Sequence, residues 1–115
     1  TLLTEVTQAM TAAREETFGP VMALLRARDE EAAVAMANDT PYGLAASVWG
    51  ETVSAEAIAR RLDTGQVAVN GIVKTDPRLP SGGVKRSGYG RELGPHGIHA
   101  FVNAQQVWVG PKQGA

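Results

Sequence analysis

The pattern of apolar and polar residues predicts three strands that alternate with two helices. A short apolar run at residues 21–25 follows a Gly-Pro pair and ends at charged residues, which is typical of a buried strand. Residues 44–49 and residues 66–70 form two further runs of this kind. Because strands and helices alternate, parallel pairing with right-handed crossovers is favoured. The expected fold class is therefore α/β with a mostly parallel sheet.

The two predicted helices lie between these strands. Asp29 is expected to cap the first helix, whose apolar face consists of Ala32, Ala33, Met36 and Ala37. The turn-forming sequence NDTPYG at residues 38–43 ends it. Ser54 can cap the second helix, whose apolar face consists of Ala55, Ile58, Ala59 and Leu62. Gly65 is expected to end this helix in a left-handed conformation.

After Asn70 the sequence changes in character. Residues 82–97 hold six of the thirteen glycines together with basic side chains, which predicts an ordered loop. Pro95 is expected to open a short helix that continues through Ile98 and Phe101. Residues 106–109 alternate as a final strand does, and the tail that begins at residue 110 is expected to be frayed.

Composition and charge narrow the classes of function. The 115 residues are 43% hydrophobic and 20% charged, as in an ordinary globular domain. A net charge of −1 gives no field that favours nucleic acid or a membrane surface, and no apolar run is long enough to span a bilayer. The first residues lack a secretory signal and an initiator methionine, so we expect a cytoplasmic protein whose chain begins inside a longer one. The 115 residues contain no cysteine, which excludes a cysteine nucleophile within them.

Two phosphate-binding motifs and a metal site fail on their context. The glycines from Gly88 to Gly94 are spaced G-x-G-x-x-x-G and follow basic residues instead of a strand, unlike a dinucleotide fingerprint. Residues 83–88 match half of a P-loop, but Tyr-Gly follows where Lys-Ser or Lys-Thr is required. His96 and His99 would share a helix face, yet no third metal ligand lies nearby in the sequence. We therefore predict no metal site, and basic side chains that are mostly solvated.

Glu16 and Phe18 form a more specific pattern, two residues apart before a Gly-Pro turn. An extended segment would put both side chains on one side. A carboxylate beside an aromatic ring suits a sugar diol, because it accepts two hydrogen bonds while the ring packs against the flat side. The pattern alone favours the simpler interpretation of an exposed Glu16 and a core Phe18.

Four sequence blocks together resemble the aldehyde dehydrogenase superfamily, in its order and spacing: EETFGP at residues 15–20, ANDTPYGL at residues 37–44, GQVAVN at residues 65–70 and GGVKRSGYGRE at residues 82–92. KTDPRLP at residues 74–80 and GIHAFVN at residues 97–103 are most similar to the succinate-semialdehyde dehydrogenase branch. The resemblance implies a C-terminal part of the catalytic domain at residues 1–103, an oligomerisation strand at residues 104–110 and a flexible tail at residues 111–115. It also implies oxidation of an aldehyde, such as succinate semialdehyde, to the acid with reduction of NAD or NADP.

The resemblance assigns roles to four residues. Glu16 corresponds to the carboxylate that holds the nicotinamide ribose hydroxyls, and Phe18 to a ring that packs beside the cofactor. Thr75 aligns with a hydroxyl that can receive the distal carboxylate of the substrate, in a loop that walls the aldehyde tunnel. Ser81 stands where family members usually have Phe, which widens or polarises the tunnel. Asn70 resembles a position near the catalytic loop, although a structural hydrogen bond explains it equally well.

The remaining machinery of the family would lie outside these residues. The nucleophilic cysteine, the general-base glutamate, the oxyanion asparagine and the dinucleotide-binding domain all belong upstream of Thr1 in the family. We therefore expect no catalytic residue in this chain, no activity from the chain alone, and homo-oligomer formation through the strand at residues 106–109. The alternative is a non-catalytic, stand-alone remnant that acts through strand-mediated assembly.

Overall fold

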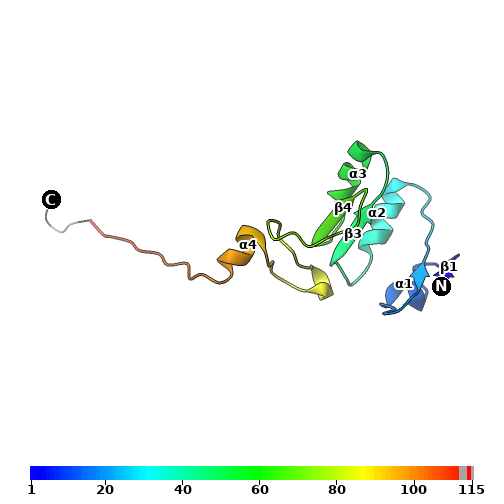
Figure 1. Ribbon diagram of the computed structural model, residues 1–115, viewed down its shortest axis with the longest axis horizontal. Coiled ribbons are helices and arrows are strands. Elements are labelled where there is room, and N and C mark those ends of the chain that lie inside the picture. The colour runs from blue at the N-terminus through cyan, green and yellow to red at the C-terminus, as the bar shows by residue number, and fades with distance from the viewer. Residues whose placement is uncertain (112–113, 115) are drawn as a thin grey trace.

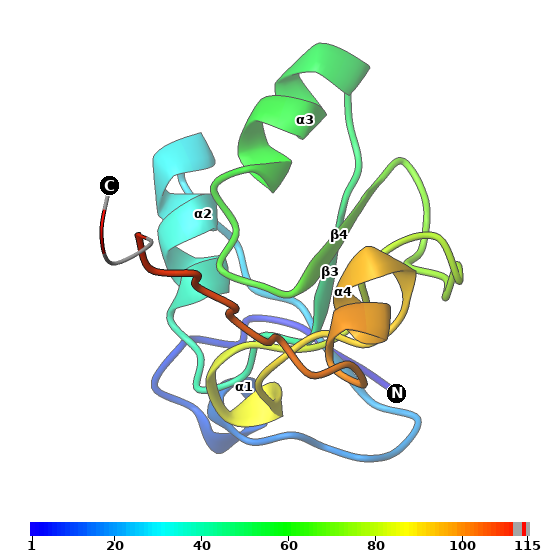
Figure 2. The ribbon, with the colours of Figure 1, turned by 90° about the vertical axis from the view of Figure 1, so that its left-hand side faces the viewer.

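The computed structural model describes residues 1–111 and residue 114. Its centre is a parallel pair of strands, β3 (Ala45–Val48) and β4 (Gln66–Val69), which begins with Ala45 opposite Gln66 and ends with Val48 opposite Val69. The helix α3 (Thr52–Ala59) connects these strands and packs against both, and α2 (Glu30–Asn38) precedes them (Figure 1). In Figure 2, α3 stands above the strands and α2 lies to the left of α3. The expected helices and the parallel β3–β4 pair are confirmed.

The predicted single sheet is instead two separate pairs of strands. Near the N-terminus, β1 (Leu2–Leu3) pairs in parallel with β2 (Met22–Ala23), and the short helix α1 (Thr11–Arg14) lies between them in sequence. The run at residues 21–25 thus contains a strand, but it pairs with β1 and not with β3. A two-residue strand such as β1 is too short to produce a periodic signal, so the sequence pattern did not predict it.

The helix caps agree with the prediction for α2 and correct it for α3. The Asp29 carboxylate accepts a hydrogen bond from the Ala32 backbone N–H at 2.8 Å, as expected for an N-cap. In α3 the cap is Glu51, not Ser54, because the Glu51 carboxylate accepts from the backbone N–H groups of Ser54 at 2.9 Å and Val53 at 3.1 Å. These hydrogen bonds lower the pKa of the Glu51 carboxyl. The bond from the Ser54 N–H has the largest effect.

The expected left-handed role of Gly65 is also wrong. Gly65 does not have a positive φ, and α3 already ends at Ala59. The position requires glycine for a different reason, since a Cβ there would lie 1.7 Å from the Gly82 carbonyl oxygen. Close approach of the glycine-rich segment to the start of β4 therefore explains this residue.

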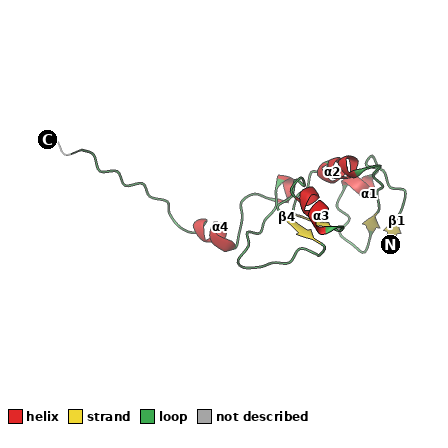
Figure 3. Ribbon diagram, turned by 90° about the horizontal axis from the view of Figure 1, so that it is seen from above, coloured by secondary structure: helices red, strands yellow, loops and turns green. Residues whose placement is uncertain are grey.

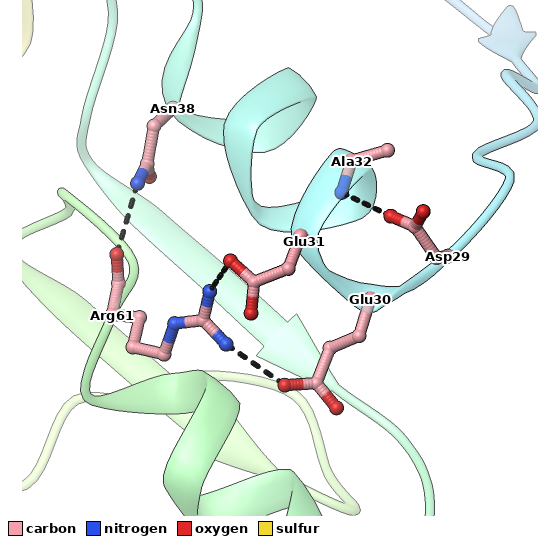
Figure 4. Close-up of polar contacts among 6 residues, drawn as sticks. All are labelled: Asp29, Glu30, Glu31, Ala32, Asn38 and Arg61. Carbon is pink, nitrogen blue, oxygen red and sulfur yellow. Dashed lines mark hydrogen bonds and ion pairs between the residues drawn. The ribbon is translucent and has the colours of Figure 1, made fainter.

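A cluster of polar contacts joins α2 to the segment that follows α3 (Figure 4). The Arg61 guanidinium contacts Glu30 at 2.8 Å and Glu31 at 2.5 Å. At the other end of α2, the Asn38 amide donates to the Arg61 carbonyl at 2.9 Å and accepts from the Asp63 N–H at 2.8 Å. These contacts hold the two helical segments together without burying charge.

The C-terminal third holds the 3₁₀ turn η1 (Lys85–Ser87) and the helix α4 (Gly94–His99), which has Pro95 in its first turn as predicted but stops before Phe101. From there the chain runs away from the body as one long loop (Figure 3). Residues 106–109 pair with no other strand in the part of the chain that the structure describes, so the predicted final strand is absent from this single chain. Residues 112, 113 and 115 of the predicted tail lie outside the described residues.

Little apolar surface is buried. Within residues 1–111, only Val6, Val34 and Ala55 are buried apolar side chains, while many large ones are exposed, Phe18, Trp49, Tyr89, Phe101 and Trp108 among them. No helix in the described part of the chain is long and apolar enough to cross a membrane.

Candidate functional site

Two clefts flank the β3–β4 pair, and each contains predicted site residues. The first lies beside β4, has a volume of about 660 Å³, and is lined by the start of β4, by residues 72–76 and by residues 79–81. Thr75 and Ser81 both belong to this lining, so the fold brings these two predicted substrate residues into one cleft. The Thr75 and Ser81 hydroxyls are the groups that the sequence analysis assigned to substrate binding. These roles in binding stay predictions.

A tight turn that begins at Asp76 and ends at Leu79 contributes to the wall of this cleft. The Asp76 carboxylate accepts hydrogen bonds from the Arg78 backbone N–H at 2.9 Å, from Arg78 Nε at 2.9 Å and from Arg78 Nη2 at 2.6 Å. The Leu79 N–H donates to the Asp76 carbonyl at 3.0 Å and closes the turn. The bonds from Arg78 lower the pKa of the Asp76 carboxyl, so this group is ionised near neutral pH.

The same loop is fixed to the glycine-rich segment at both of its ends. Ser81 and Glu92 form an antiparallel bridge, in which each backbone N–H donates to the other carbonyl at 2.8 Å. The Gly94 N–H donates to the Pro77 carbonyl at 3.0 Å. The backbone of Ser81 is therefore held firmly, and its partly buried side chain has a defined place on the rim of the cleft.

The second cleft has a volume of about 560 Å³ and contains Glu16. Glu15 and Glu16 contribute to its lining, together with residues at the start of β3 and with Arg86 and Ser87 of η1. Phe18 does not line this cleft, and its side chain is 98% exposed. Phe18 is therefore not a core residue, and within this chain the pair Glu16 and Phe18 does not share one cleft.

A hydrogen-bonded junction that the sequence did not reveal lies beside the second cleft. The Gly43 N–H donates to Ser87 Oγ at 3.0 Å, and the Gly43 carbonyl accepts from the N–H groups of Gly65 at 3.0 Å and Val84 at 2.9 Å. Lys85 adds a side-chain contact, since its ammonium group donates to the Asn38 carbonyl at 2.8 Å and lies 3.1 Å from Asp63. The turn after α2, the start of β4 and the glycine-rich segment are thereby joined.

Asn70 has a structural role. Its φ of 51° is left-handed, and its side-chain amide accepts from the Gly50 N–H at 2.9 Å and donates to the Gly50 carbonyl at 3.0 Å. This pair of bonds ties the end of β4 to the end of β3. The structural hydrogen bond, one of the two explanations that the sequence left open, is confirmed.

Comparisons with known proteins identify similar chains. The sequence profile described as the Aldehyde dehydrogenase family matches residues 1–107. A probable succinate-semialdehyde dehydrogenase (NADP(+)) of Synechocystis sp. is 47% identical over 110 residues, which are 95% of this chain and 24% of that protein. The succinate semialdehyde dehydrogenase (NAD(P)+) Sad of Escherichia coli is 48% identical over 109 residues, 94% of this chain and 24% of its own. This chain therefore spans about a quarter of the length of these curated relatives.

Solved structures of aldehyde dehydrogenases also superpose on this chain. The succinic semialdehyde dehydrogenase of Streptococcus pyogenes in complex with NADP+ superposes with a TM-score of 0.87 at 35% identity, over 94% of this chain and 24% of that one. An aldehyde dehydrogenase of Mycobacterium tuberculosis complexed with NAD+ gives a TM-score of 0.82 at 44% identity, over 87% of this chain and 21% of that one.

Proposed function

Because the chain belongs to the aldehyde dehydrogenase family, we propose that it is the C-terminal part of an NAD(P)-dependent enzyme that oxidises succinate semialdehyde to the dicarboxylic acid. The observation that carries this proposal is the cleft beside β4, whose lining includes both Thr75 and Ser81. A hydroxyl can donate a charge-assisted hydrogen bond to a carboxylate, which is stronger than a bond between neutral groups. Two hydroxyl-bearing residues on one cleft therefore suit an aldehyde whose far end is a carboxylate.

The proposed cofactor contact is the Glu16 carboxylate. Glu16 is among the residues that line a cleft of about 560 Å³, and its carboxylate has no hydrogen bond or ion pair among the residues that the structure describes. Both of its oxygens are thus available to accept bonds from the two hydroxyls of a ribose. Phe18 is exposed and would pack beside the cofactor from outside this lining. When bound, the nicotinamide supplies the acceptor for the hydride of the aldehyde.

A second candidate is a non-catalytic product that acts by assembly. Its support is the extended C-terminal segment, in which the side chains of Val107, Trp108 and Val109 are 77%, 76% and 86% exposed. An unpaired extended segment of this kind can add to the edge of a sheet in another chain. In the enzyme proposal, the same segment is proposed to form the homo-oligomer contact of residues 104–110.

The coding sequence upstream of Thr1 separates the two candidates. An in-frame segment that encodes a cysteine-bearing domain supports the enzyme, whereas a start codon immediately before Thr1 supports the stand-alone product.

Kinetics of the complete protein then test the activity. We expect reduced nicotinamide to form with NAD or NADP, and kcat/KM to be higher for succinate semialdehyde than for butanal, which has the same carbon chain without the distal carboxylate. Absence of turnover, or equal kcat/KM for the two aldehydes, would contradict the proposal.

A further inference from the structure

The cleft that contains Thr75 and Ser81 also contains a negative charge. The charged residues in its lining are Lys74 and Asp76, so Asp76 is the one acidic residue there, as far as the described residues go. The Asp76 side chain is only 28% exposed. An ionised carboxylate at this place would repel a substrate that carries its own carboxylate.

Arg78 compensates this charge from the solvent side. Its guanidinium donates to both Asp76 oxygens, through Nε at 2.9 Å and Nη2 at 2.6 Å, and its side chain is 86% exposed. Arg78 is not part of the cleft lining. Its guanidinium therefore acts on the cleft through Asp76 and not by direct contact.

We propose that Arg78 is a positioning residue that holds the Asp76 carboxylate in the turn and cancels its charge, so that the cleft accepts an aldehyde with a distal carboxylate. The inference rests on the proposed function and deepens it, since it names a contact that reduces the repulsion between Asp76 and an anionic substrate in a cleft whose lining also contains Lys74. Two-point contact by a guanidinium keeps the opposite charges close together. The Asp76 carboxylate is then directed at Arg78 and its field at the substrate is reduced.

Removing Arg78 alone should expose the repulsion. In the complete enzyme, Arg78→Gln leaves Asp76 ionised and unpaired, so we expect KM for succinate semialdehyde to rise roughly 3–10-fold, because the exposed pair is screened by water and salt. The kcat for this substrate and both constants for butanal should stay unchanged. The rise in KM should shrink as the salt concentration increases.

A second substitution distinguishes this role from a merely structural one. Asp76→Asn removes the charge but keeps an oxygen that can accept the hydrogen bond from the Arg78 backbone N–H, so the turn persists. The double variant Asp76→Asn/Arg78→Gln should therefore restore KM for succinate semialdehyde to within about twofold of the parent value. If Arg78 only stabilised the loop, the second substitution would deepen the defect.

Arg28→Gln is a matched control. Arg28, which is as exposed as Arg78, forms an ion pair with the neighbouring Asp29 at 3.0 Å, and neither residue lines the cleft beside β4. The Arg28→Gln variant should leave KM for both succinate semialdehyde and butanal unchanged. An Arg78→Gln variant that affects both aldehydes equally, or a double variant that stays impaired, would overturn the inference. A parent enzyme that does not prefer succinate semialdehyde to butanal would instead overturn the proposed function.

Discussion

At the scale of single residues, Glu16 gives the most direct test of the cofactor site. Its carboxylate lines the second cleft and is proposed to fix the nicotinamide ribose. In the complete enzyme, Glu16→Gln keeps the shape but loses the charge, so we expect hydride transfer to slow by roughly 10–100-fold as the ring is misplaced. Cofactor affinity should change less, because most binding contacts are proposed to lie elsewhere in the complete enzyme.

Single-turnover kinetics at saturating cofactor, with deuterated aldehyde, measure this step. Glu15→Gln is the control, since Glu15 lines the same cleft without a proposed contact to the ribose. An unchanged rate without an isotope effect in the Glu16 variant would make Glu16 an ordinary surface carboxylate.

Ser81 tests the substrate cleft. Ser81→Phe would place a large apolar side chain in the lining of the cleft beside β4, and Phe is the residue that the family resemblance leads us to expect at this position. Selectivity between a short and a bulky aldehyde should shift by about 1–3 kcal/mol, as is usual for changes of pocket size. The measurement is the ratio of kcat/KM for the two aldehydes, with the distant Ser54→Phe as control. A ratio that does not move would remove Ser81 from the substrate site.

The sequence placed two predicted site residues together where they are close in the chain, and it did not predict the contacts made where the chain folds back on itself; the roles of these residues stay predictions. Thr75 and Ser81 lie in one short loop, and they share a cleft. The Gly43–Ser87 bond joins positions 44 residues apart, and no local pattern indicates such a contact. The Asp76–Arg78 turn had a usable signal in the sequence Asp-Pro-Arg, because Asp before Pro favours a turn closed by its own side chain. Phe18 is 98% exposed and does not line the cleft that contains Glu16, an arrangement that the spacing of the two residues does not indicate.

At the scale of secondary structure, the prediction succeeded for elements whose first and last residues both favour the same helix bounds. For α2, the predicted capping residue Asp29 and the predicted polar turn after the helix are both confirmed. For α3 the pattern named the nearest serine, whereas Glu51 reaches the free N–H groups with its longer side chain. Pairing of β2 with β1 instead of β3 is a tertiary outcome that strand propensity does not encode.

Gly65 provides the test at this scale. In Gly65→Ala the new Cβ would lie 1.7 Å from the Gly82 carbonyl oxygen, so β4 or the glycine-rich segment must move. We expect a destabilisation of about 2–4 kcal/mol, the range of a severe steric clash. Gly71→Ala is the matched control, because the nearest atom to its Cβ would be 3.8 Å away. Thermal unfolding of the complete enzyme should show a lower Tm for the first variant only, and equal Tm values would contradict the close approach.

At the scale of the whole molecule, the chain exposes far more surface than a compact domain of its size. Its accessible surface is 9350 Å² and its radius of gyration is 20.4 Å. Compact proteins of this mass and length have about 6,000 Å² and about 13 Å. The excess accompanies the long C-terminal segment that leaves the body (Figure 1) and the many large apolar side chains that are exposed along the chain. Such surfaces are typical of parts that other polypeptide covers, in agreement with the proposal that this chain works within a larger enzyme.

The activity of the 115-residue chain by itself is the corresponding test. In the proposed enzyme, a cysteine thiolate forms the thiohemiacetal that donates the hydride, and the 115 residues contain no cysteine. Purified chain, incubated with succinate semialdehyde and either NAD or NADP, should therefore produce no absorbance in the band of the reduced nicotinamide. The complete enzyme, assayed at the same molar concentration, is the positive control and should turn over. Robust, cofactor-dependent turnover by the chain alone, persisting through repeated purification, would show that the nucleophile is not a cysteine and would contradict the proposed mechanism while leaving the family assignment intact.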